Sequence, residues 1–383
     1  MKKSVLIITN HYMDDNNGGA NCSKAYIRAL SELFPNTTLM YPKREKDVGL
    51  CFIPPAIKAI PVYDDRSMVQ KVVDIYRGVL TRMVDSVRNH LGGNKYDVIV
   101  VDHSVTASGI MSFLKKTGSK IVTIHHNDET QYLKDNKPFF LYRIPKMHFA
   151  AKAENECLLT SCLNITLTEH DAQTFAGRFP TKIIHAHCVG TFQYENLPES
   201  ISIIKRDNRF TFAITGSLYF PQSSKPVVEF VDKYYPIILK KVPKAKLIVA
   251  GRNPSNHVKE ICAKHSSIEL VPNPEDIQAV IKRADYYICP INMGSGVKLR
   301  AMDGLRQGLP VLSHIISTNG YEKIVEDGYM FGYDDELSFE TSLTKMLGAD
   351  CSSQDVYKSF YSYFSFEAGK ARLKAILEKE GLI

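Results

Sequence analysis

The sequence has no apolar run that approaches the roughly 18 residues of a membrane-spanning helix. Its first segment, MKKSVLIITNHY, returns to polar residues after about six apolar positions, which is too few for the core of a signal peptide. We therefore expect this segment to be a buried strand. We expect any membrane association to be peripheral, through the protein surface.

Zinc-type cysteine spacing and clustered basic residues are also lacking. The eight cysteines are scattered, and none forms a CxxC motif or a Cys/His pair with the spacing of a zinc site. Scattered cysteines are typical of reduced thiols, so we expect a cytoplasmic protein. The net charge of +7 comes from dispersed lysines and arginines, without a recognisable nucleic-acid-binding module. This excess of positive charge favours solubility, and it is compatible with attraction to anionic lipids or phosphorylated ligands.

What the sequence does contain is a series of short apolar runs between helix-length segments. Most runs are continuous rather than alternating, which is typical of parallel strands buried on both faces. Strands that alternate with helices predict a doubly wound α/β sheet. The expected strands are 4–9, 96–102, 120–126, 163–169, 182–187, 210–217, 246–251, 267–271, 285–291 and 309–314.

The series breaks once, in the polar stretch 191–208, and then resumes. A chain of 383 residues is long enough for two domains. We predict a first domain at 1–190, a linker at 191–208 and a second domain at 209–354, followed by a helical C-terminal segment. The aromatic run from Phe360 to Phe366 favours packing of this segment against the protein, with a basic and aromatic membrane contact as the alternative.

Ligands of doubly wound sheets bind outside the carboxyl ends of the strands, so residues that follow strands are candidates. Gly18 and Gly19 follow the first strand, where glycines let backbone N–H groups approach an anion. No GxGxxG fingerprint is present, so a simple loop is the alternative. In IHHNDE, His126 ends a strand and can exchange a proton near neutral pH, although capping and turn roles stay open. The ligands there are too few to predict a metal site.

Two further candidates follow strands in the second half. Gly216 and Ser217 end the strand 210–217 and lead into a helix, whose N-terminus would suit a phosphate. Arg252 directly follows the strand 246–251, where its guanidinium would hold a phosphate or form a surface ion pair.

The stretch MGSGVKLRAMDGLRQGLPV combines several features of a phosphate site. Gly294, Ser295 and Gly296 form a loop that opens a predicted helix. Lys298 near the first turn is unfavourable beside the partial positive charge of a helix start, unless an anion binds the same N–H groups. Asp303 lies further along, and its carboxylate could accept hydrogen bonds from two ribose hydroxyls. Together these residues predict a nucleoside diphosphate site in the second domain.

Taken in order, the motifs resemble those of the GT-B glycosyltransferases of the GT4 family, the glycosyl transferases group 1. GSLYFPQSSKPVVEFVDKYYPIILKKVPKAKLIVAGRNP is similar to the start of that family's donor domain, and GSGVKLRAMDGLRQGLPV resembles its donor-site signature. HHNDE and LTEHDAQTF resemble two segments of its acceptor domain. The resemblance covers nearly the whole chain. It implies an α/β fold of two doubly wound, Rossmann-like domains facing a central cleft, with the C-terminal helix 355–383 crossing back to the first domain.

The resemblance also implies roles for the candidate residues. Lys298 would meet the donor diphosphate, Asp303 would bind the ribose, and His126 would lie near the donor sugar and the acceptor. Gly18 and Gly19 would approach the donor phosphates from the first domain.

Charge on the leaving β-phosphate would be stabilised by Lys298, Arg252 and the N–H groups of 216–217 and 294–296. We thus expect His126, Lys298 and Arg252 as catalytic residues. We expect no cofactor and no essential metal.

Three positions depart from the family pattern. Ser295 stands where many members have a glutamate that touches the donor sugar, and Asp303 stands where a glutamate normally binds the ribose. Ser217 stands where the family has an arginine, and Arg252 or Lys225 would supply that charge.

The expected function is transfer of a sugar from a UDP- or GDP-sugar to a hydroxyl of a glycan or lipid-linked acceptor, in the synthesis of cell-surface polysaccharide or glycoconjugates. The resemblance implies retention of configuration. Because no carboxylate pair is placed for double displacement, we expect this retention to arise from same-face attack. A non-catalytic subunit that binds sugar nucleotide or glycan and stabilises another glycosyltransferase is the alternative, and a sugar-nucleotide 2-epimerase is a third. We expect no nucleic-acid partner, and a cytoplasmic location with peripheral contact at the inner face of the membrane.

Overall fold

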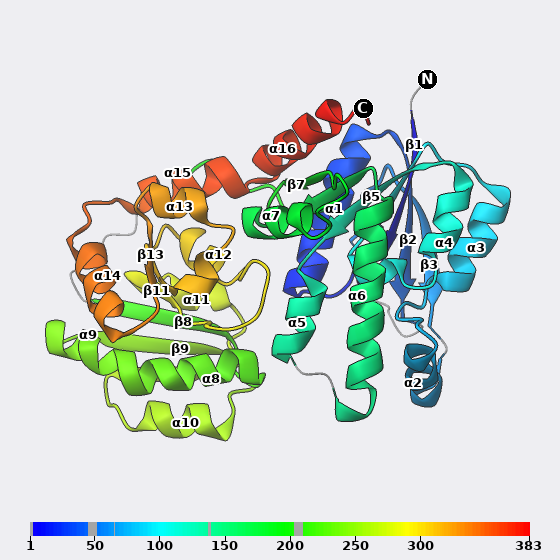
Figure 1. Ribbon diagram of the computed structural model, residues 1–383. Helices are drawn as coiled ribbons and strands as arrows, with labels where there is room; N and C mark the ends of the chain where they lie inside the picture. The colour runs from blue at the N-terminus through cyan, green and yellow to red at the C-terminus, as the bar shows by residue number, and fades with distance from the viewer. Residues whose placement is uncertain (1–2, 45–51, 65, 137–138, 203–209) are drawn as a thin grey trace. The chain divides into compact units, whose positions relative to one another are not determined.

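The computed structural model describes residues 3–383 apart from 45–51, 65, 137–138 and 203–209 (Figure 1). It divides into two compact units, one formed by Met1–Asn196 with Phe364–Ile383 and the other by Leu197–Tyr363. The first boundary thus lies inside the stretch 191–208 that we expected as a linker, and the second unit extends past residue 354. No helix within the described ranges is long and apolar enough to cross a membrane.

The first unit is built on a parallel sheet with the strand order β3-β2-β1-β4-β5-β6-β7. Its central strands are buried on both faces, because helices cover the sheet on each side. The strands are β1 (Ser4–Thr9), β2 (Asn36–Lys43), β3 (Lys58–Tyr63), β4 (Val98–Asp102), β5 (Lys120–His125), β6 (Leu163–Thr166) and β7 (Ala186–Cys188). The helices are α1 (Gly18–Leu33), α2 (Met68–Tyr76), α3 (Val84–Gly93), α4 (Met111–Leu114), α5 (Glu129–Asn136), α6 (Arg143–Thr160), α7 (Glu169–Gly177) and α16 (Phe366–Lys379), with short 3₁₀ turns η1 (Ser104–Ala107), η2 (Lys115–Thr117) and η3 (Phe140–Tyr142).

The second unit repeats this plan with the strand order β10-β9-β8-β11-β12-β13, again in parallel pairs. Its strands are β8 (Thr211–Ser217), β9 (Lys246–Arg252), β10 (Ile268–Pro272), β11 (Tyr286–Cys289), β12 (Val311–His314) and β13 (Met330–Tyr333). Its helical segments are α8 (Pro221–Glu229), η4 (Phe230–Tyr234), α9 (Tyr235–Lys241), α10 (Asn256–Ala263), α11 (Ile277–Ile281), α12 (Ala301–Leu305), η5 (Ile315–Thr318), α13 (Glu322–Glu326), α14 (Glu336–Gly348) and α15 (Ser353–Phe364). The expectation of two doubly wound α/β sheets is confirmed.

The apolar runs form the cores of the two sheets. In the first unit, Leu6 and Ile8 of β1 pack with Ile99 and Val101 of β4 in one fully buried cluster. In the second unit the cluster joins β8, β9 and β11 to the helical segment 221–241. That segment is not one regular helix, because a π-helical turn, η4, separates α8 from α9 near its prolines.

The C-terminal aromatic run is packed, as we expected. The rings of Phe360, Phe364 and Phe366 are at most 1% exposed, so they are not available for contact with a membrane. Helix α16 lies against α1, where the guanidinium of Arg28 stacks on the Phe366 ring at 3.6 Å. The ammonium of Lys370 reaches Glu32 of α1 at 2.7 Å, and the last helix thereby belongs to the first unit.

Candidate functional site

Each sheet has one point at which the strand order reverses, between β1 and β4 in the first unit and between β8 and β11 in the second. The carboxyl ends of the two strands beside such a point open a crevice in which doubly wound folds bind ligands. The candidate residues follow these strands, so each unit is described in turn.

In the second unit, an arginine that the sequence analysis did not single out lies over the end of β8. The Arg300 guanidinium packs against Gly216, in the space that a Cβ at this position would occupy. Gly216 has a φ of 147°, which favours glycine, so both space and backbone require a residue without a side chain here. Arg300 Nη2 also donates to Ser223 Oγ of α8 at 3.1 Å. A positive charge thus lies directly against the backbone of the strand end.

Asp303 of α12 lies next to this arginine at the end of β8. Its Oδ2 accepts a long hydrogen bond of 3.4 Å from Thr215 Oγ1, and that hydroxyl also bonds Tyr287 OH of β11 at 2.6 Å. Burial raises the pKa of Asp303 to about 6, against the opposing effect of the Arg300 charge. The site therefore holds a carboxylate that is largely removed from water and only weakly hydrogen-bonded within the protein.

Lys298 does not occupy the first turn of a helix. Helix α12 begins at Ala301, and the Lys298 ammonium folds back onto the loop before it. It donates to the carbonyl oxygens of Gly294, Ser295 and Gly296 at 2.7, 2.6 and 3.1 Å. Glycines at 294 and 296 have φ values of 86° and 69°, a conformation that turns these carbonyls inward. In this structure Lys298 therefore ties the GSG loop together.

Ser217 and Arg252 stand side by side at the carboxyl ends of β8 and β9, as register partners in the parallel pairing. Gly251 is required there, because a Cβ at this position would overlap the Gly216 carbonyl oxygen. Arg252 itself is exposed. The structure places it at the strand end that the sequence predicted, beyond the Gly216 position that Arg300 covers.

In the first unit, Gly18 and Gly19 are the first residues of α1, after the N-cap Asn17, whose side chain accepts from the Ala20 N–H at 3.0 Å. The His11 ring lies directly against Gly19, and a Cβ on Gly19 would overlap it. The glycine therefore admits an imidazole at the switch point, a contact that the spacing of the glycines alone did not predict.

Three imidazoles meet at this end of the sheet. The rings of His11 and His126 stack with their centroids 5.2 Å apart, and His103 lies edge-on to both, at 5.4 and 5.2 Å. Burial and the neighbouring imidazoles lower the pKa of His11 to about 3, so this ring stays neutral at physiological pH. Each of the three rings follows a strand end: β1, β4 or β5.

A buried aspartate orients the candidate catalytic histidine. Asp102 Oδ1 lies 2.8 Å from His126 Nε2, and its Oδ2 accepts from Thr9 Oγ1 at 2.6 Å and Ser23 Oγ at 2.5 Å. Burial opposes ionisation of Asp102, but the interaction with His126 and the hydrogen bond from Ser23 hold its pKa below the ordinary value. The carboxylate thus fixes the position of the His126 ring.

A second imidazole–carboxylate pair lies beside the first. His103 Nε2 lies 2.9 Å from Glu129 Oε1, and the His103 backbone has a φ of 71°, in the sparsely populated left-handed region. Burial would lower the pKa of His103, but the Glu129 charge raises it overall. Strain of this kind is concentrated at functional sites, which is consistent with a site at this strand end.

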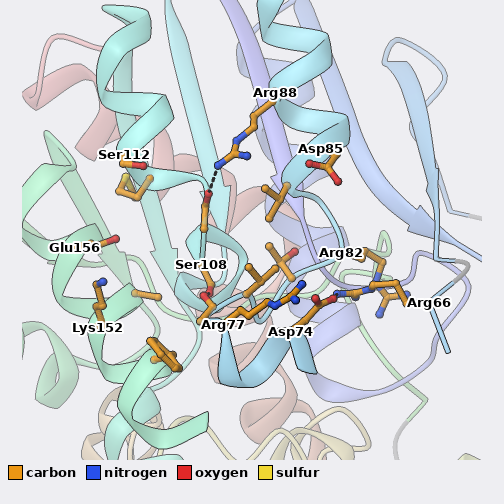
Figure 2. Close-up of a pocket in the computed structure, with 18 residues that line it drawn as sticks. Arg66, Asp74, Arg77, Arg82, Asp85, Arg88, Ser108, Ser112, Lys152 and Glu156 are labelled. Atoms are coloured by element: carbon orange, nitrogen blue, oxygen red, sulfur yellow. Dashed lines mark hydrogen bonds and ion pairs between the residues drawn. The ribbon is translucent and has the colours of Figure 1, made fainter. Parts of the chain in front are cut away.

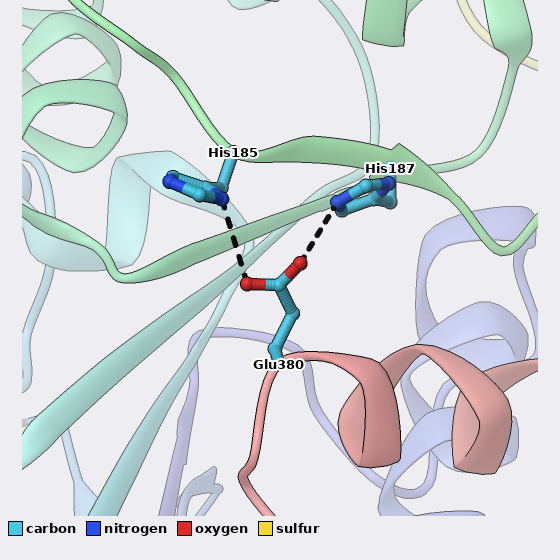
Figure 3. A group of neighbouring side chains, drawn as sticks. All are labelled: His185, His187 and Glu380. Atoms are coloured by element: carbon cyan, nitrogen blue, oxygen red, sulfur yellow. Dashed lines mark hydrogen bonds and ion pairs between the residues drawn. The ribbon is translucent and has the colours of Figure 1, made fainter.

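Two further features lie outside these strand ends. A pocket of about 600 Å³ opens among α2, α3 and α6 of the first unit, and its lining includes five basic side chains (Figure 2). Among the described residues, the group of three side chains able to converge on one metal ion is His185, His187 and Glu380 (Figure 3). Neither feature includes a residue that the sequence analysis proposed for the site.

Comparisons with known proteins bear on the family and the fold. Residues 209–348 match the model of the family described as glycosyl transferases group 1. A curated relative, an uncharacterized 44.6 kDa protein in the cps region of Klebsiella pneumoniae, is 24% identical over 243 residues, which span 59% of this chain and 59% of the relative.

Solved structures match over nearly the whole chain. A sucrose-phosphate synthase from Thermosynechococcus elongatus superposes with a TM-score of 0.73 at 11% identity, covering 98% of both chains. An Escherichia coli structure titled trehalose-6-phosphate bound with UDP-2-fluoro glucose gives 0.67 at 12% identity, covering 99% of both. At such identities the likeness shows the fold, and the family match adds the class of enzyme. Residues 209–348 match the glycosyl transferases group 1 family, and the chain as a whole has the GT-B fold.

Proposed function

We propose that the protein transfers a sugar from a nucleoside diphosphate sugar, a UDP- or GDP-sugar, to a hydroxyl of a glycan or lipid-linked acceptor during synthesis of cell-surface polysaccharide. The observation that carries this proposal is the group formed by Gly216, Arg300 and Asp303 at the switch point of the unit that matches the family. The UDP-2-fluoro glucose of the Escherichia coli neighbour and the cps-region origin of the Klebsiella relative support the donor class and the pathway class.

Each part of this group suits one part of such a donor. Gly216 makes room for the Arg300 guanidinium at the end of β8, and this guanidinium offers a planar, permanently charged partner for phosphate oxygens. Within the described ranges, the Asp303 carboxylate accepts one weak hydrogen bond, from Thr215, so it has capacity for the two vicinal hydroxyls of a ribose. We assign the phosphate contact first to Arg300, and then to Lys298 and Arg252.

The chemistry follows from where charge develops. As the glycosidic bond breaks, negative charge grows on the β-phosphate, and cations fixed in place stabilise it without reorganisation. The acceptor hydroxyl would attack the same face of the oxocarbenium-like sugar, with its proton passing to the leaving phosphate, so configuration is retained. In the first unit, Asp102 would hold the His126 ring in one orientation for contact with the donor sugar and acceptor. This scheme uses no metal ion and no cofactor.

A nucleotide-release assay tests the proposal. The purified chain is incubated with UDP-, GDP-, ADP-, CMP- and dTDP-sugars without acceptor, and the released nucleotide is measured. We expect slow release from one donor, reduced at least about tenfold in Arg300→Met, because one charge-assisted contact is lost. Lys345→Ala, a change at an exposed position on α14, serves as the control and should leave the rate unchanged.

The non-catalytic alternative rests on Ser295 and Asp303, which replace two glutamates of the family pattern. It predicts a different result: no release from any donor, no thermal stabilisation by any nucleotide, and co-purification with a second glycosyltransferase. Binding of one nucleotide with turnover that appears only once an acceptor is added would instead support the enzyme.

We further propose peripheral contact with the inner face of the cell membrane through the first unit. Met68 and Val69 of α2 are 78% and 72% exposed, and Phe140 and Ile144 at η3 and the start of α6 are 73% and 80% exposed. Helix α2 and η3 lie in contact, so these side chains gather on one surface. A contiguous apolar surface of this kind is typical of an interaction site.

Vesicle co-sedimentation tests this contact. The chain should bind vesicles that contain anionic phospholipid, and the pair Met68→Gln with Ile144→Gln should bind at least about fivefold more weakly, since it removes apolar area from the surface. Ile183→Gln is the control, because Ile183 is 87% exposed and lies elsewhere on the first unit. Equal binding by both variants would contradict the assignment to α2 and η3.

A further inference from the structure

We infer that His185, His187 and Glu380 form a binding site for a divalent transition-metal ion of the zinc class, apart from the switch point of the sheet (Figure 3). The three side chains come from distant parts of the sequence: His187 is in the edge strand β7, His185 directly precedes it, and Glu380 is the C-cap of the last helix, α16. Their ligand atoms all lie within 4.8 Å of one another. This inference is independent of the proposed sugar transfer.

Both imidazoles lie beside the Glu380 carboxylate (Figure 3). His187 is in β7, whereas His185 directly precedes the strand, in a turn where the Ala186 N–H donates to the Ile184 carbonyl at 3.0 Å. The backbone here is fixed on its inner side, where the His185 carbonyl accepts from the Asn164 N–H at 2.7 Å and His187 is the register partner of Ile165 in β6. The imidazoles are accessible to solvent, because 52% of the His185 side chain and 27% of the His187 side chain are exposed.

The backbone that carries the Glu380 carboxylate is also fixed. Glu380 is the C-cap of α16, and Gly381 after it has a φ of 62°. The Gly381 N–H donates to the Glu378 carbonyl at 3.0 Å and the Leu382 N–H donates to the Leu377 carbonyl at 2.8 Å, which together form a Schellman motif. Because the Leu382 side chain is fully buried, the position of Glu380 is set by the packing of the chain end.

The separations of the ligand atoms fit a metal ion. His187 Nε2 lies 3.1 Å from Glu380 Oε1, and His185 Nδ1 lies 3.5 Å from Oε2. Ligands of a tetrahedral zinc ion lie about 2.0–2.2 Å from the metal, which places neighbouring ligand atoms about 3.3–3.6 Å apart. Small side-chain shifts would bring all three groups to one ion. Two imidazoles and a carboxylate are a ligand set that zinc uses in proteins, with water in the fourth position.

A bound ion would clamp the end of the chain to the edge of the sheet. Helix α16 is reached only after the chain has passed through the second unit, and it packs on α1. A metal bridge from Glu380 to β7 would add a second attachment for this returning helix. Because the ion binds the folded chain and not the unfolded one, it would raise the temperature of unfolding in proportion to the logarithm of its concentration.

The test is a calorimetric titration of the full-length chain, freed of metal with EDTA, with ZnCl₂. The exposed thiol of Cys162 is replaced in all samples by Cys162→Ser, so that it does not bind the metal. We expect one zinc ion per chain, and a dissociation constant that rises at least about tenfold in His187→Gln and in Glu380→Gln, since each removes one ligand. Co²⁺ should give the visible absorption of a tetrahedral complex, lost in the same variants.

The matched control is His170→Gln, which removes an exposed histidine on α7 that is not a member of the group. It should bind zinc like the parent. The variants are compared by circular dichroism in EDTA, which confirms that they fold, as expected at positions accessible to solvent. Zinc binding that is unchanged in both His187→Gln and Glu380→Gln, or absent from the parent at millimolar ZnCl₂, would overturn the assignment and leave the three residues as a hydrogen-bonded group only.

Discussion

Replacing Asp303 with asparagine should make the protein more stable and less able to bind its donor. Burial raises the pKa of this carboxyl from 3.8 to about 6. The folded state therefore holds the proton more tightly than the unfolded chain, and the folded state loses stability as the pH rises from about 4 to about 6. Above this range the cost is about 3 kcal/mol, at 1.36 kcal/mol for each pH unit of the pKa difference.

Asparagine removes this cost because it has no charge to desolvate. It is close in size to aspartate and can still accept the hydrogen bond of Thr215. Urea unfolding of Asp303→Asn should thus show a free energy of unfolding up to about 3 kcal/mol above the parent at pH 7.5, and about half that gain at pH 5. Asp350→Asn, at an exposed position of the same unit, should change it by less than about 0.5 kcal/mol at either pH.

Function should change in the opposite direction. A carboxylate accepts the hydrogen bonds of two ribose hydroxyls more strongly than an amide oxygen does, so Asp303→Asn should weaken nucleotide binding by about tenfold or more. Isothermal titration with the nucleotide identified in the release assay measures this loss. A variant that is less stable than the parent at pH 7.5 would refute the desolvation argument, and one that is more stable yet binds nucleotide equally well would refute the ribose contact.

Three more changes test other parts of the architecture. Gly216→Ala should displace the Arg300 guanidinium and lower nucleotide release at least about tenfold, because a Cβ has no room at a φ of 147°. Asp102→Asn should lower the transfer rate about a hundredfold and cost about 3 kcal/mol of unfolding free energy, because it leaves His126 without its buried charged partner. Gly369→Ala should lower the unfolding free energy by about 1–3 kcal/mol in urea, because its Cβ would overlap a phenylalanine ring beneath α16.

The glycine predictions share a control. Gly177, the last residue of α7, has no atom near its Cβ position, and alanine there should be neutral or slightly stabilising. If Gly369→Ala were equally neutral, the close packing of α16 would be wrong.

The stability of Asp102→Asn should match that of the parent only at low pH. A carboxyl whose pKa is held below its ordinary value stabilises the fold above about pH 4 and loses that contribution as the pH falls.

The sheets were predictable wherever a strand is a continuous apolar run. SVLIIT and KLIVAG are inner strands of their sheets, buried along most of their length, and their bounds agree with the sequence expectation to within a residue. The sequence analysis did not predict the strands β2, β3 and β13. NTTLMYPK begins with polar residues and contains a proline, and MFGY is too short and contains a glycine, so neither shows the pattern of a buried strand.

The sequence predicted where the candidate site residues lie in the fold better than it predicted which residues contact one another there. Its residues follow strands, and strand ends are local features of the sequence, so the neighbourhoods of Gly216, His126 and Asp303 could be named. His11 and His103 also follow strands, in IITNHY and VVDHS, and this signal could have found them. The contact of Arg300 with Gly216 could not be found this way, because it depends on the path of the GSG loop, which is set by backbone conformation at two glycines.

That path also changes how a loss of activity at Lys298 must be interpreted. The Lys298 ammonium holds three carbonyl oxygens of the loop that leads to α12, whereas the Arg300 guanidinium stands over the strand end where a diphosphate would lie. Lys298→Ala would therefore loosen the loop and displace Arg300 and Asp303 with it, even if the ammonium never touched the donor. A comparison with Arg300→Met separates loss of a phosphate contact from loss of the loop conformation. The Lys298 ammonium already binds the carbonyl oxygens of the loop, whereas the Arg300 guanidinium does not.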